Sequence, residues 1–267
     1  MSTIREMSDL KGRRAIITGA MGNLGSVIAD SLAELGADLY LVDRPGSDFV
    51  KKEAELTSRW GVNVVSMACD LESESDRTLL MSAIKSDALP VNILVNNAAF
   101  VGTSNLTGWG VPFEEQTVET WRRAMEVNLT SAFHLCQGLW ESMKSAKGAS
   151  IVNIGSIYGS LGPDWSLYEG TDMSNPAAYG ASKGGLIQLT RWLSTTMAPS
   201  VRVNCISPGG IFRNQPERFV QRYEQRTPLK RMAKEEDFKG GIAYMASDLS
   251  AYVTGQHLMI DGGWGIW

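Results

Sequence analysis

RAIITGAMGNLGSVIADSLAELGADLYLVD, residues 14–43, is the stretch that decides the fold. It begins and ends with short β-rich runs, Arg14–Thr18 and Asp38–Val42. A glycine-rich turn follows the first run and opens a segment whose apolar residues recur at helical spacing: Leu24, Val27, Ile28, Leu32 and Leu35. Gly36 then supplies a helix stop. A strand, a crossover helix and a second strand in this order predict two parallel strands of one sheet.

The same alternation continues along the chain. Further strands are expected at Val62–Ala68, Val91–Val95, Ser150–Ile154, Val201–Ile206 and His257–Ile260. Two long helices are predicted, Gln116–Lys147, bent or broken near Asn128, and Pro176–Met197. We therefore expect an α/β protein, a single doubly wound domain over residues 1–267 with helices on both faces of a parallel sheet.

Composition limits the possible partners and the compartment. The net charge of -4 argues against a surface dedicated to nucleic acid or to anionic membrane. The N-terminus lacks the apolar core of a signal peptide, and no run approaches the roughly 18 apolar residues of a membrane span. Three cysteines without paired spacing favour a reducing cytoplasm. We expect a cytoplasmic protein with a small-molecule partner, without nucleic acid or membrane.

No metal site is predicted. The cysteines, Cys69, Cys136 and Cys205, lie within apolar segments and lack the spacing of zinc ligands. His134 and His257 fall in a predicted helix and a predicted strand, with no partner at metal-ligand spacing. We interpret both histidines as structural.

The glycine turn, TGAMGNLG from Thr18 to Gly25, lies at a strand-to-helix junction. Glycines at Gly19, Gly22 and Gly25 let backbone amides approach a pyrophosphate, and the helix N-terminus adds partial positive charge. By themselves these glycines are equally consistent with a tight turn that binds nothing.

An acidic residue ends the second strand. Asp43 lies eighteen residues beyond Gly25, where a carboxylate accepts hydrogen bonds from an adenosine ribose and repels a 2′-phosphate. NAD is therefore favoured over NADP, although Arg44 is able to pair with such a phosphate. The alternative is that Asp43 merely begins a strand-end turn, Asp-Arg-Pro-Gly. Asp70 and Asn97 follow the third and fourth strands, at the sheet edge where open α/β sheets bind ligands.

A second group of residues follows the strand Ser150–Ile154. Ser156 comes directly after this strand, and Tyr179 and Lys183 follow in YGASK. Residues four apart share one helical face, so the ammonium is expected beneath the phenol, where it favours the phenolate. Bringing a tyrosine from its ordinary pKa near 10 to about 7 requires roughly 4 kcal/mol of preferential stabilisation. A Tyr-x-x-x-Lys pair alone is common on solvated helices, so its pairing with Ser156 and Asn128 carries the prediction.

Together these elements resemble the short-chain dehydrogenase/reductase family over nearly the whole chain. The matching elements are TGAMGNLG, Asp43, Asp70, NNAA, Asn128, Ser156, YGASK, the PGG at 208–210 and the DGG at 261–263. The resemblance implies a Rossmann-type sheet of about seven strands, NAD(P)-dependent oxidoreductase activity on CH–OH groups, and a homotetramer or homodimer.

The resemblance also assigns roles. Tyr179 is the implied general acid/base, Lys183 lowers its pKa and binds the nicotinamide ribose, Ser156 hydrogen-bonds the reacting oxygen, and Asn128 belongs to a proton relay. The implied cofactor-binding residues are Gly19, Gly22, Asn23, Leu24, Gly25, Asp43, Asp70, Leu71, Asn97, Ala98, Ala99, Tyr179, Lys183, Pro208, Gly209 and Ile211.

Three features depart from the family pattern. Asn23 stands where short members usually carry glycine, and Arg213 stands where a threonine often contacts the carboxamide. The step from Ser156 to Tyr179 is longer than usual because of a substrate-side insertion at 160–175. The insertion resembles those of oxidoreductases in bacterial surface-sugar pathways. Its candidate substrate residues are Trp165, Tyr168 and Glu169, with Arg213 as a fourth.

We expect a sugar or a sugar-derived acid as the substrate. The alternative role for the insertion is packing against a neighbouring subunit. Residues 213–230 form a predicted lid whose arginines, Arg213, Arg218, Arg222 and Arg226, either clamp an anion or face solvent. Trp264 and Trp267 lie on an apolar tail that either meets another subunit or packs on its own.

Two other functions remain open at this point. The chain is either a hydride-transferring enzyme or a dinucleotide-sensing module without turnover, and the joint presence of Ser156, Tyr179, Lys183 and Asn128 favours the enzyme. An epimerase or dehydratase that retains NAD is suggested by the glycine turn, but the chain is too short for the additional substrate domain.

Overall fold

A computed structural model describes residues 1–86, 89–100 and 106–267. They form one α/β domain around a seven-stranded sheet in the order β3-β2-β1-β4-β5-β6-β7. All six neighbouring strand pairs are parallel. The strands are β1 (Arg14–Thr18), β2 (Asp38–Asp43), β3 (Val64–Ala68), β4 (Ile93–Asn96), β5 (Ala149–Ile154), β6 (Val201–Pro208) and β7 (His257–Ile260). The predicted doubly wound fold is confirmed.

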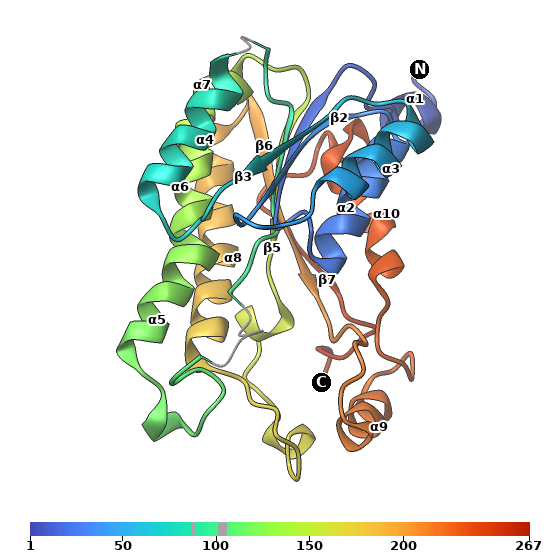
Figure 1. The fold of residues 1–267 in the computed structure, drawn as a ribbon. Helices are drawn as coiled ribbons and strands as arrows, with labels where there is room; N and C mark the ends of the chain where they lie inside the picture. Colours follow the sequence, from blue (N-terminus) through green and yellow to red (C-terminus); the bar gives the residue numbers. More distant parts are fainter. Residues whose placement is uncertain (87–88, 101–105) are drawn as a thin grey trace.

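Helices cover both faces of the sheet (Figure 1). One face carries α2 (Asn23–Glu34), α3 (Val50–Trp60) and α10 (Lys239–Ala246), and the other carries α4 (Glu74–Ser86), α5 (Val118–Met125), α6 (Ser131–Gly138) and α8 (Ala177–Met197). Alternation along β1 divides the core, because Ala15 and Ile17 pack with α2 and Ile16 packs with α4 and α6. The short helix α7 (Trp140–Lys144) continues the layer of α6, with Met143 in the same core, whereas α1 (Ile4–Ser8) and α9 (Glu217–Arg226) lie outside these layers.

The predicted strand bounds are correct for β1 and β7 and differ elsewhere. The expected strand Val91–Val95 begins at Ile93, because Val91 is buried as part of the core and its backbone N–H donates to the Ser142 hydroxyl at 3.0 Å instead of joining the ladder. Likewise β3 begins at Val64. β6 extends two residues further than expected, to Pro208, which places the PGG turn against the sheet edge.

The helix predicted over 116–147 is interrupted where Asn128 lies. A π-helical turn, η2 (Glu126–Thr130), separates α5 from α6, and a further break separates α6 from α7. Such turns are frequent at functional sites because they widen the helix and redirect one side chain. The other predicted long helix is confirmed as the unbroken α8, which begins at Ala177.

The insertion and the predicted lid pack together beyond the carboxyl edge of the sheet (Figure 1). The insertion contains one 3-10 turn, η4 (Trp165–Leu167), and the lid contains α9. Arg226 and Asp164 form an ion pair at 2.7 Å, and Arg222 donates to the Glu169 carbonyl at 2.6 Å. These arginines therefore join the lid to the insertion.

The C-terminal tail packs on its own subunit at one of its two tryptophans. Trp264 is buried against Tyr223 and beneath the Arg226 guanidinium, whereas Trp267 is largely exposed. Among the described helices, none combines the length and the apolar character needed to cross a membrane.

Candidate active site

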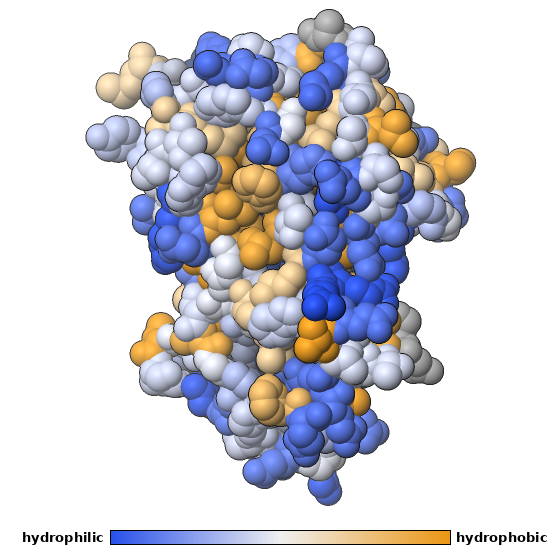
Figure 2. Space-filling view, turned by 90° about the vertical axis from the view of Figure 1, so that its left-hand side faces the viewer, coloured by the Kyte–Doolittle hydropathy of each residue, from blue (hydrophilic) through white to orange (hydrophobic). Residues whose placement is uncertain are grey.

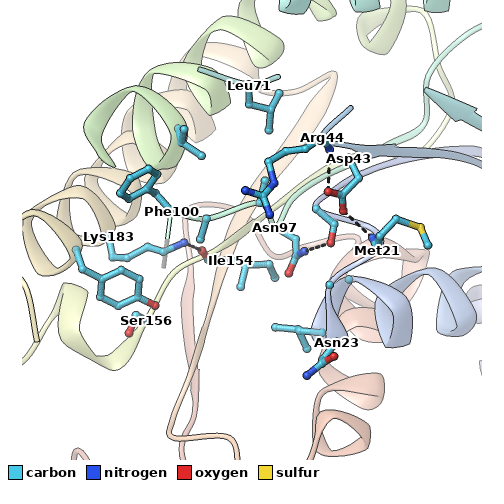
Figure 3. Close-up of a pocket in the computed structure, with 18 of the residues that line it drawn as sticks. Met21, Asn23, Asp43, Arg44, Leu71, Asn97, Phe100, Ile154, Ser156 and Lys183 are labelled. Carbon is cyan, nitrogen blue, oxygen red and sulfur yellow. Dashed lines mark hydrogen bonds between the residues drawn. The ribbon is translucent and has the colours of Figure 1, made fainter. Parts of the chain in front are cut away.

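A cavity of about 750 Å³ opens at the carboxyl edge of the sheet. Residues from the loops after β1 to β6 line it, as a doubly wound sheet requires of its ligand crevice. The structure brings all of the implied cofactor-binding residues to this cavity: Gly19, Gly22, Asn23, Leu24, Gly25, Asp43, Asp70, Leu71, Asn97, Ala98, Ala99, Tyr179, Lys183, Pro208, Gly209 and Ile211. Figure 3 shows Ser156 and Lys183 at one end and Asp43 and Met21 at the other.

The glycine turn is built for close backbone approach. Gly19 has φ +64°, and a Cβ there would lie 2.8 Å from the Ala98 Cα. A Cβ at Gly25 would lie 2.0 Å from the Gly19 carbonyl oxygen. Gly22 caps α2 without a side-chain hydrogen bond, which leaves the first amides of this helix facing the cavity. Uncapped helix amides beside an open cavity fit the pyrophosphate of a dinucleotide.

Asp43 is fixed at the far end of the cavity. One carboxylate oxygen accepts the Met21 N–H at 2.8 Å, and the other accepts the Arg44 N–H at 2.8 Å and the Ser47 hydroxyl at 3.2 Å (Figure 3). The carboxylate thereby ties the glycine turn to the end of β2. The Arg44 side chain extends into the cavity above Asn97 (Figure 3), so a cation lies beside this carboxylate.

The loop after β4 is held by the first strand. The Thr18 hydroxyl accepts the backbone N–H groups of Asn97 and Ala98 at 3.0 and 3.1 Å. The Asn97 amide donates in return to the carbonyls of Thr18 and Gly19, at 2.9 and 3.1 Å. These four bonds fix the floor of the cavity between β1 and β4.

Ser156, Tyr179 and Lys183 meet above the carboxyl end of β5. The Ser156 side chain lies beside the Tyr179 phenol and favours its ionised form, and the Lys183 ammonium lies 5.9 Å from the centre of the tyrosine ring. Lys183 is buried and donates from Nζ to the Ile154 carbonyl at 2.7 Å. The spacing in YGASK thus positions the ammonium beneath the ring, as the sequence predicts.

The pKa values at this site differ from the simplest expectation. Burial raises the pKa of Tyr179, and the Ser156 hydrogen bond and the Arg213 charge oppose that rise. Burial also lowers the pKa of Lys183 to about 8. The cation that most clearly favours the phenolate within this chain is therefore Arg213, a residue to which the sequence assigned only substrate binding.

Asn128 lies behind the site rather than at its surface. Its side-chain carbonyl accepts the Phe100 N–H at 2.6 Å, and its amide donates to the Ser182 hydroxyl at 2.9 Å. Asn128 is buried and lines neither of the two cavities described here. In this structure its side chain joins the loop after β4 to α8, and its part in a proton relay stays a prediction.

The four predicted substrate residues are not all brought to the site. Arg213 lines the large cavity and forms an ion pair with Glu235 at 3.1 Å. Tyr168 is buried and lines a second cavity. Trp165 and Glu169 line neither cavity, because η4 turns the indole outward, where it is 56% exposed, and the exposed Glu169 contributes only its backbone carbonyl to Arg222.

The second cavity, of about 200 Å³, adjoins the first. Its lining includes Tyr158, Tyr223 and Met232, none of which sequence reasoning found. Ser156 and Tyr179 line both cavities. No local pattern marks Tyr158 or Tyr223, because they reach the site through the packing of α9 and the loop after β5.

Further residues missed by sequence reasoning border the large cavity. Arg123 forms a two-point contact with Glu72, at 2.7 and 3.2 Å, and lies over the Phe100 ring. This pair joins α5 to the loop after β3. Within the described residues no cluster of three or more histidine, cysteine or acidic side chains is placed to hold a metal ion.

A dinucleotide-sized cavity that has Tyr179 on its wall, beside the buried Ser156 and Lys183, defines a nicotinamide-dependent oxidoreductase. The comparisons with known proteins agree. A family model described as enoyl-(acyl carrier protein) reductase matches residues 19–265. The chain belongs to the short-chain dehydrogenase/reductase family, whose members act on CH–OH groups with NAD(P).

Three similar proteins illustrate the family. A galactitol 2-dehydrogenase (L-tagatose-forming) of Cereibacter sphaeroides is 30% identical, with 98% of this chain and 99% of the relative covered. A short chain dehydrogenase of Leptospira borgpetersenii with bound NAD+ is 32% identical with TM-score 0.83, covering 99% and 96%. A gluconate 5-dehydrogenase of Burkholderia cenocepacia in complex with NADP and tartrate is 25% identical with TM-score 0.84, covering 99% and 100%.

Proposed function

We propose that this chain is an NAD-linked dehydrogenase of a small polyhydroxylated secondary alcohol, or a reductase of the corresponding carbonyl compound. One observation carries the proposal: Ser156 and Tyr179 line both the large cavity and the small one, so they stand where a dinucleotide and a second molecule would meet. Acid/base groups at such a junction are suited to hydride transfer between the two.

The roles of the residues follow from their geometry. In oxidation Tyr179 takes the alcohol proton, and in reduction it returns that proton to the developing alkoxide. Ser156, beside the phenol, is positioned to hold the reacting oxygen there. Lys183, fixed on the Ile154 carbonyl, is positioned to bind the ribose next to the nicotinamide. The cofactor, when bound, supplies or accepts the hydride.

NAD is the preferred cofactor in this proposal. The Asp43 carboxylate lines the cavity at its adenosine end, where it offers ribose hydroxyls an acceptor and opposes a 2′-phosphate. Arg44 supports the opposite preference, since its guanidinium lies in the same cavity and is able to pair with a phosphate. Among the similar structures, one contains NAD+ and three contain NADP, so they do not favour NAD.

The substrate class is proposed as a sugar alcohol or a sugar acid. The named substrates of two similar proteins, galactitol and gluconate, are polyhydroxylated six-carbon compounds. Arg213 supports an acid, because its guanidinium lines the cavity near Tyr179. Glu235 supports a neutral polyol, because its carboxylate already balances the arginine charge.

A screen of alcohols tests the function. Hexitols, aldonates, sugar phosphates and simple secondary alcohols are incubated with NAD and with NADP, and reduced nicotinamide is followed by its absorbance. We expect turnover of polyhydroxylated compounds with NAD. If the protein binds dinucleotide and turns over none of these alcohols, it is a sensing module instead. Isomerisation of a sugar without net reduction of cofactor would identify an epimerase.

Two further features belong to the proposal. We propose a homotetramer or homodimer, since Trp121, Phe133 and Trp192 expose apolar rings on the helices α5, α6 and α8, and Figure 2 shows apolar side chains gathered on this side of the molecule. We also propose a cytoplasmic location, which the three free and buried cysteines support.

A further inference from the structure

The small cavity beside Tyr179 is enclosed by a continuous group of aromatic rings. Tyr158, Tyr168, Phe219 and Tyr223 line it, and Trp264 packs behind them. Neighbouring ring centres are 5.4 Å apart for Tyr168 and Phe219, 6.0 Å for Phe219 and Tyr223, 5.8 Å for Tyr223 and Trp264, and 6.3 Å for Trp264 and Tyr158. The hydroxyls of Tyr158 and Tyr168 close the circuit at 2.7 Å.

The lining carries no ionic group. Every described residue on the small cavity is uncharged at neutral pH, and most present carbon: Ser156, Ile157, Tyr158, Tyr168, Met173, Tyr179, Pro208, Gly209, Gly210, Gln215, Phe219, Tyr223 and Met232. An anionic group that entered such a space would lose its hydration without gaining a counter-charge. Gln215 is neutral, and its amide is already hydrogen-bonded to the backbone of Ile211 and Arg213, so it offers an anion neither charge nor a free donor directed at the cavity.

The phenols nevertheless leave donors unused. Tyr158 and Tyr168 share one hydrogen bond, and Tyr168 also accepts the Asn175 amide at 3.4 Å, so one of their two hydroxyl protons has no acceptor among the described residues. The Tyr223 oxygen accepts the Gly210 N–H at 2.6 Å. The hydroxyl proton of Tyr223 therefore also has no acceptor among the described residues. Burial raises the pKa of Tyr158, so this phenol keeps its proton at any working pH.

We infer that the small cavity binds the uncharged, hydroxyl-bearing end of the substrate, with its C–H face against the aromatic rings and its oxygens accepting from the Tyr158–Tyr168 pair and from Tyr223. This inference rests on the proposed function and narrows its substrate class. A hexitol has two such ends and an aldonate has one. An aldarate, which carries a carboxylate at both ends, is excluded.

The size of the cavity supports a compact group. A volume of about 200 Å³ lies below the roughly 300–1,000 Å³ typical of sites for drug-sized ligands. The walls are also fixed on three segments, because Arg226 pairs with Asp164 and stacks on Trp264. A few carbon atoms with their hydroxyls fill this space, and a long acyl chain does not.

Matched six-carbon probes test the inference. Mannitol, glucitol and galactitol are compared with the aldonate and the aldarate of each configuration, at saturating NAD. We expect the best hexitol or aldonate to exceed its aldarate by at least 100-fold in kcat/KM. An aldarate turned over as well as its hexitol overturns the inference.

A double substitution tests the donors. Tyr158→Phe with Tyr168→Phe removes both partners of one hydrogen bond and keeps the shape of the rings, so its only further loss is the long 3.4 Å bond from the Asn175 amide and its cost to folding is small. We expect kcat/KM for the best hexitol or aldonate to fall about 10- to 100-fold, mainly through KM, because a substrate oxygen loses its donor. The affinity for NADH, measured by fluorescence, should stay unchanged, and the melting temperature should fall by no more than a few degrees.

The exposed Tyr252→Phe serves as the matched control and should behave as the wild type. A double variant with unaltered kcat/KM overturns the inference, and so does one whose NADH affinity falls in parallel, since that pattern marks a structural role. If simple secondary alcohols are oxidised and no hexitol or aldonate is, the inference fails while hydride transfer stands. If no alcohol reduces either cofactor, the proposed function itself fails.

Discussion

Lys183 donates from its ammonium to the carbonyl of Ile154 at 2.7 Å, at the carboxyl end of the interior strand β5. The lysine is therefore anchored to the sheet, with the Tyr179 ring above it at 5.9 Å. Because it is almost fully buried, its charge is held at the expense of hydration, and its pKa falls to about 8.

This arrangement predicts a trade between stability and activity. The folded pKa of Lys183 lies below its ordinary 10.5, so the cost of burying the charge is complete below about pH 8 and disappears as pH rises toward 10.5. The difference between the two pKa values of Lys183 corresponds to about 3 kcal/mol of unfolding free energy. A substitution that removes the ammonium recovers this cost but loses the hydrogen bond to Ile154, which offsets the gain by about 1 kcal/mol. We expect Lys183→Met to be inactive and about 1–3 kcal/mol more stable at pH 7, by urea unfolding. A variant less stable than wild type contradicts this.

Tyr179→Phe isolates the acid/base step. The change removes one hydroxyl and keeps the ring over Lys183, so we expect kcat/KM to fall at least about 1,000-fold with NADH affinity within a few-fold of wild type. Absorbance assays of NADH formation measure kcat/KM, and fluorescence titrations measure the affinity for NADH. A fully active variant would remove Tyr179 from the mechanism.

Arg213 is predicted to set the pH profile of oxidation. Its positive charge opposes the rise in the pKa of Tyr179, so Arg213→Gln should raise that pKa. Since oxidation needs the phenolate, the rise of kcat/KM with pH should move to higher pH in this variant. Glu235→Gln, which frees the arginine charge, should move it to lower pH. Identical profiles for both variants and wild type would refute the coupling.

Asp43→Asn tests cofactor choice. Asparagine keeps an acceptor oxygen for the Met21 N–H and removes the charge that opposes a 2′-phosphate. We expect the ratio of kcat/KM for NAD to that for NADP to fall about 10- to 100-fold. The exposed Asp48→Asn, further along the same loop, provides the control. If the wild-type protein already prefers NADP, then Arg44 and not Asp43 determines the choice of cofactor.

Gly25→Ala tests the turn. The new Cβ would lie 2.0 Å from the Gly19 carbonyl oxygen, so the backbone must move, and we expect a loss of at least about 2 kcal/mol in unfolding free energy together with weaker NADH binding. Gly240→Ala is the contrasting change, because its Cβ meets nothing within 4 Å on the helix α10. It should stabilise the protein by about 0.5–1 kcal/mol.

The sequence predicted those parts of the molecule whose causes are local. The glycine turn, Asp43 and the Tyr-Lys pair each depend on spacing within one segment, and the carboxyl ends of parallel strands meet at one edge whatever the details of packing. The cofactor cavity therefore contains the residues expected there. The interruption near Asn128 was also visible, as polar residues within an apolar helical pattern.

The substrate side could not be predicted in the same way. Tyr158, Tyr223 and Glu235 reach the site only because the insertion, α9 and the following loop fold back on the sheet, and no periodicity encodes that approach. Within the insertion, Tyr168 and Trp165 are three residues apart and equally aromatic, yet only Tyr168 lines a cavity. The difference depends on the orientation of η4 against α9, which is a long-range packing effect.

The aromatic group around the small cavity is contributed by the loop after β5, the insertion, α9 and the C-terminal tail. Each ring contacts the next one around the cavity, so none of these segments shapes the cavity alone. A chimera that receives only the insertion of a relative would inherit mismatched walls and lose selectivity. Transplanting the preference of one family member into another therefore demands exchange of all four segments at once, while the glycine turn and Asp43, which precede these segments in the chain, are left untouched.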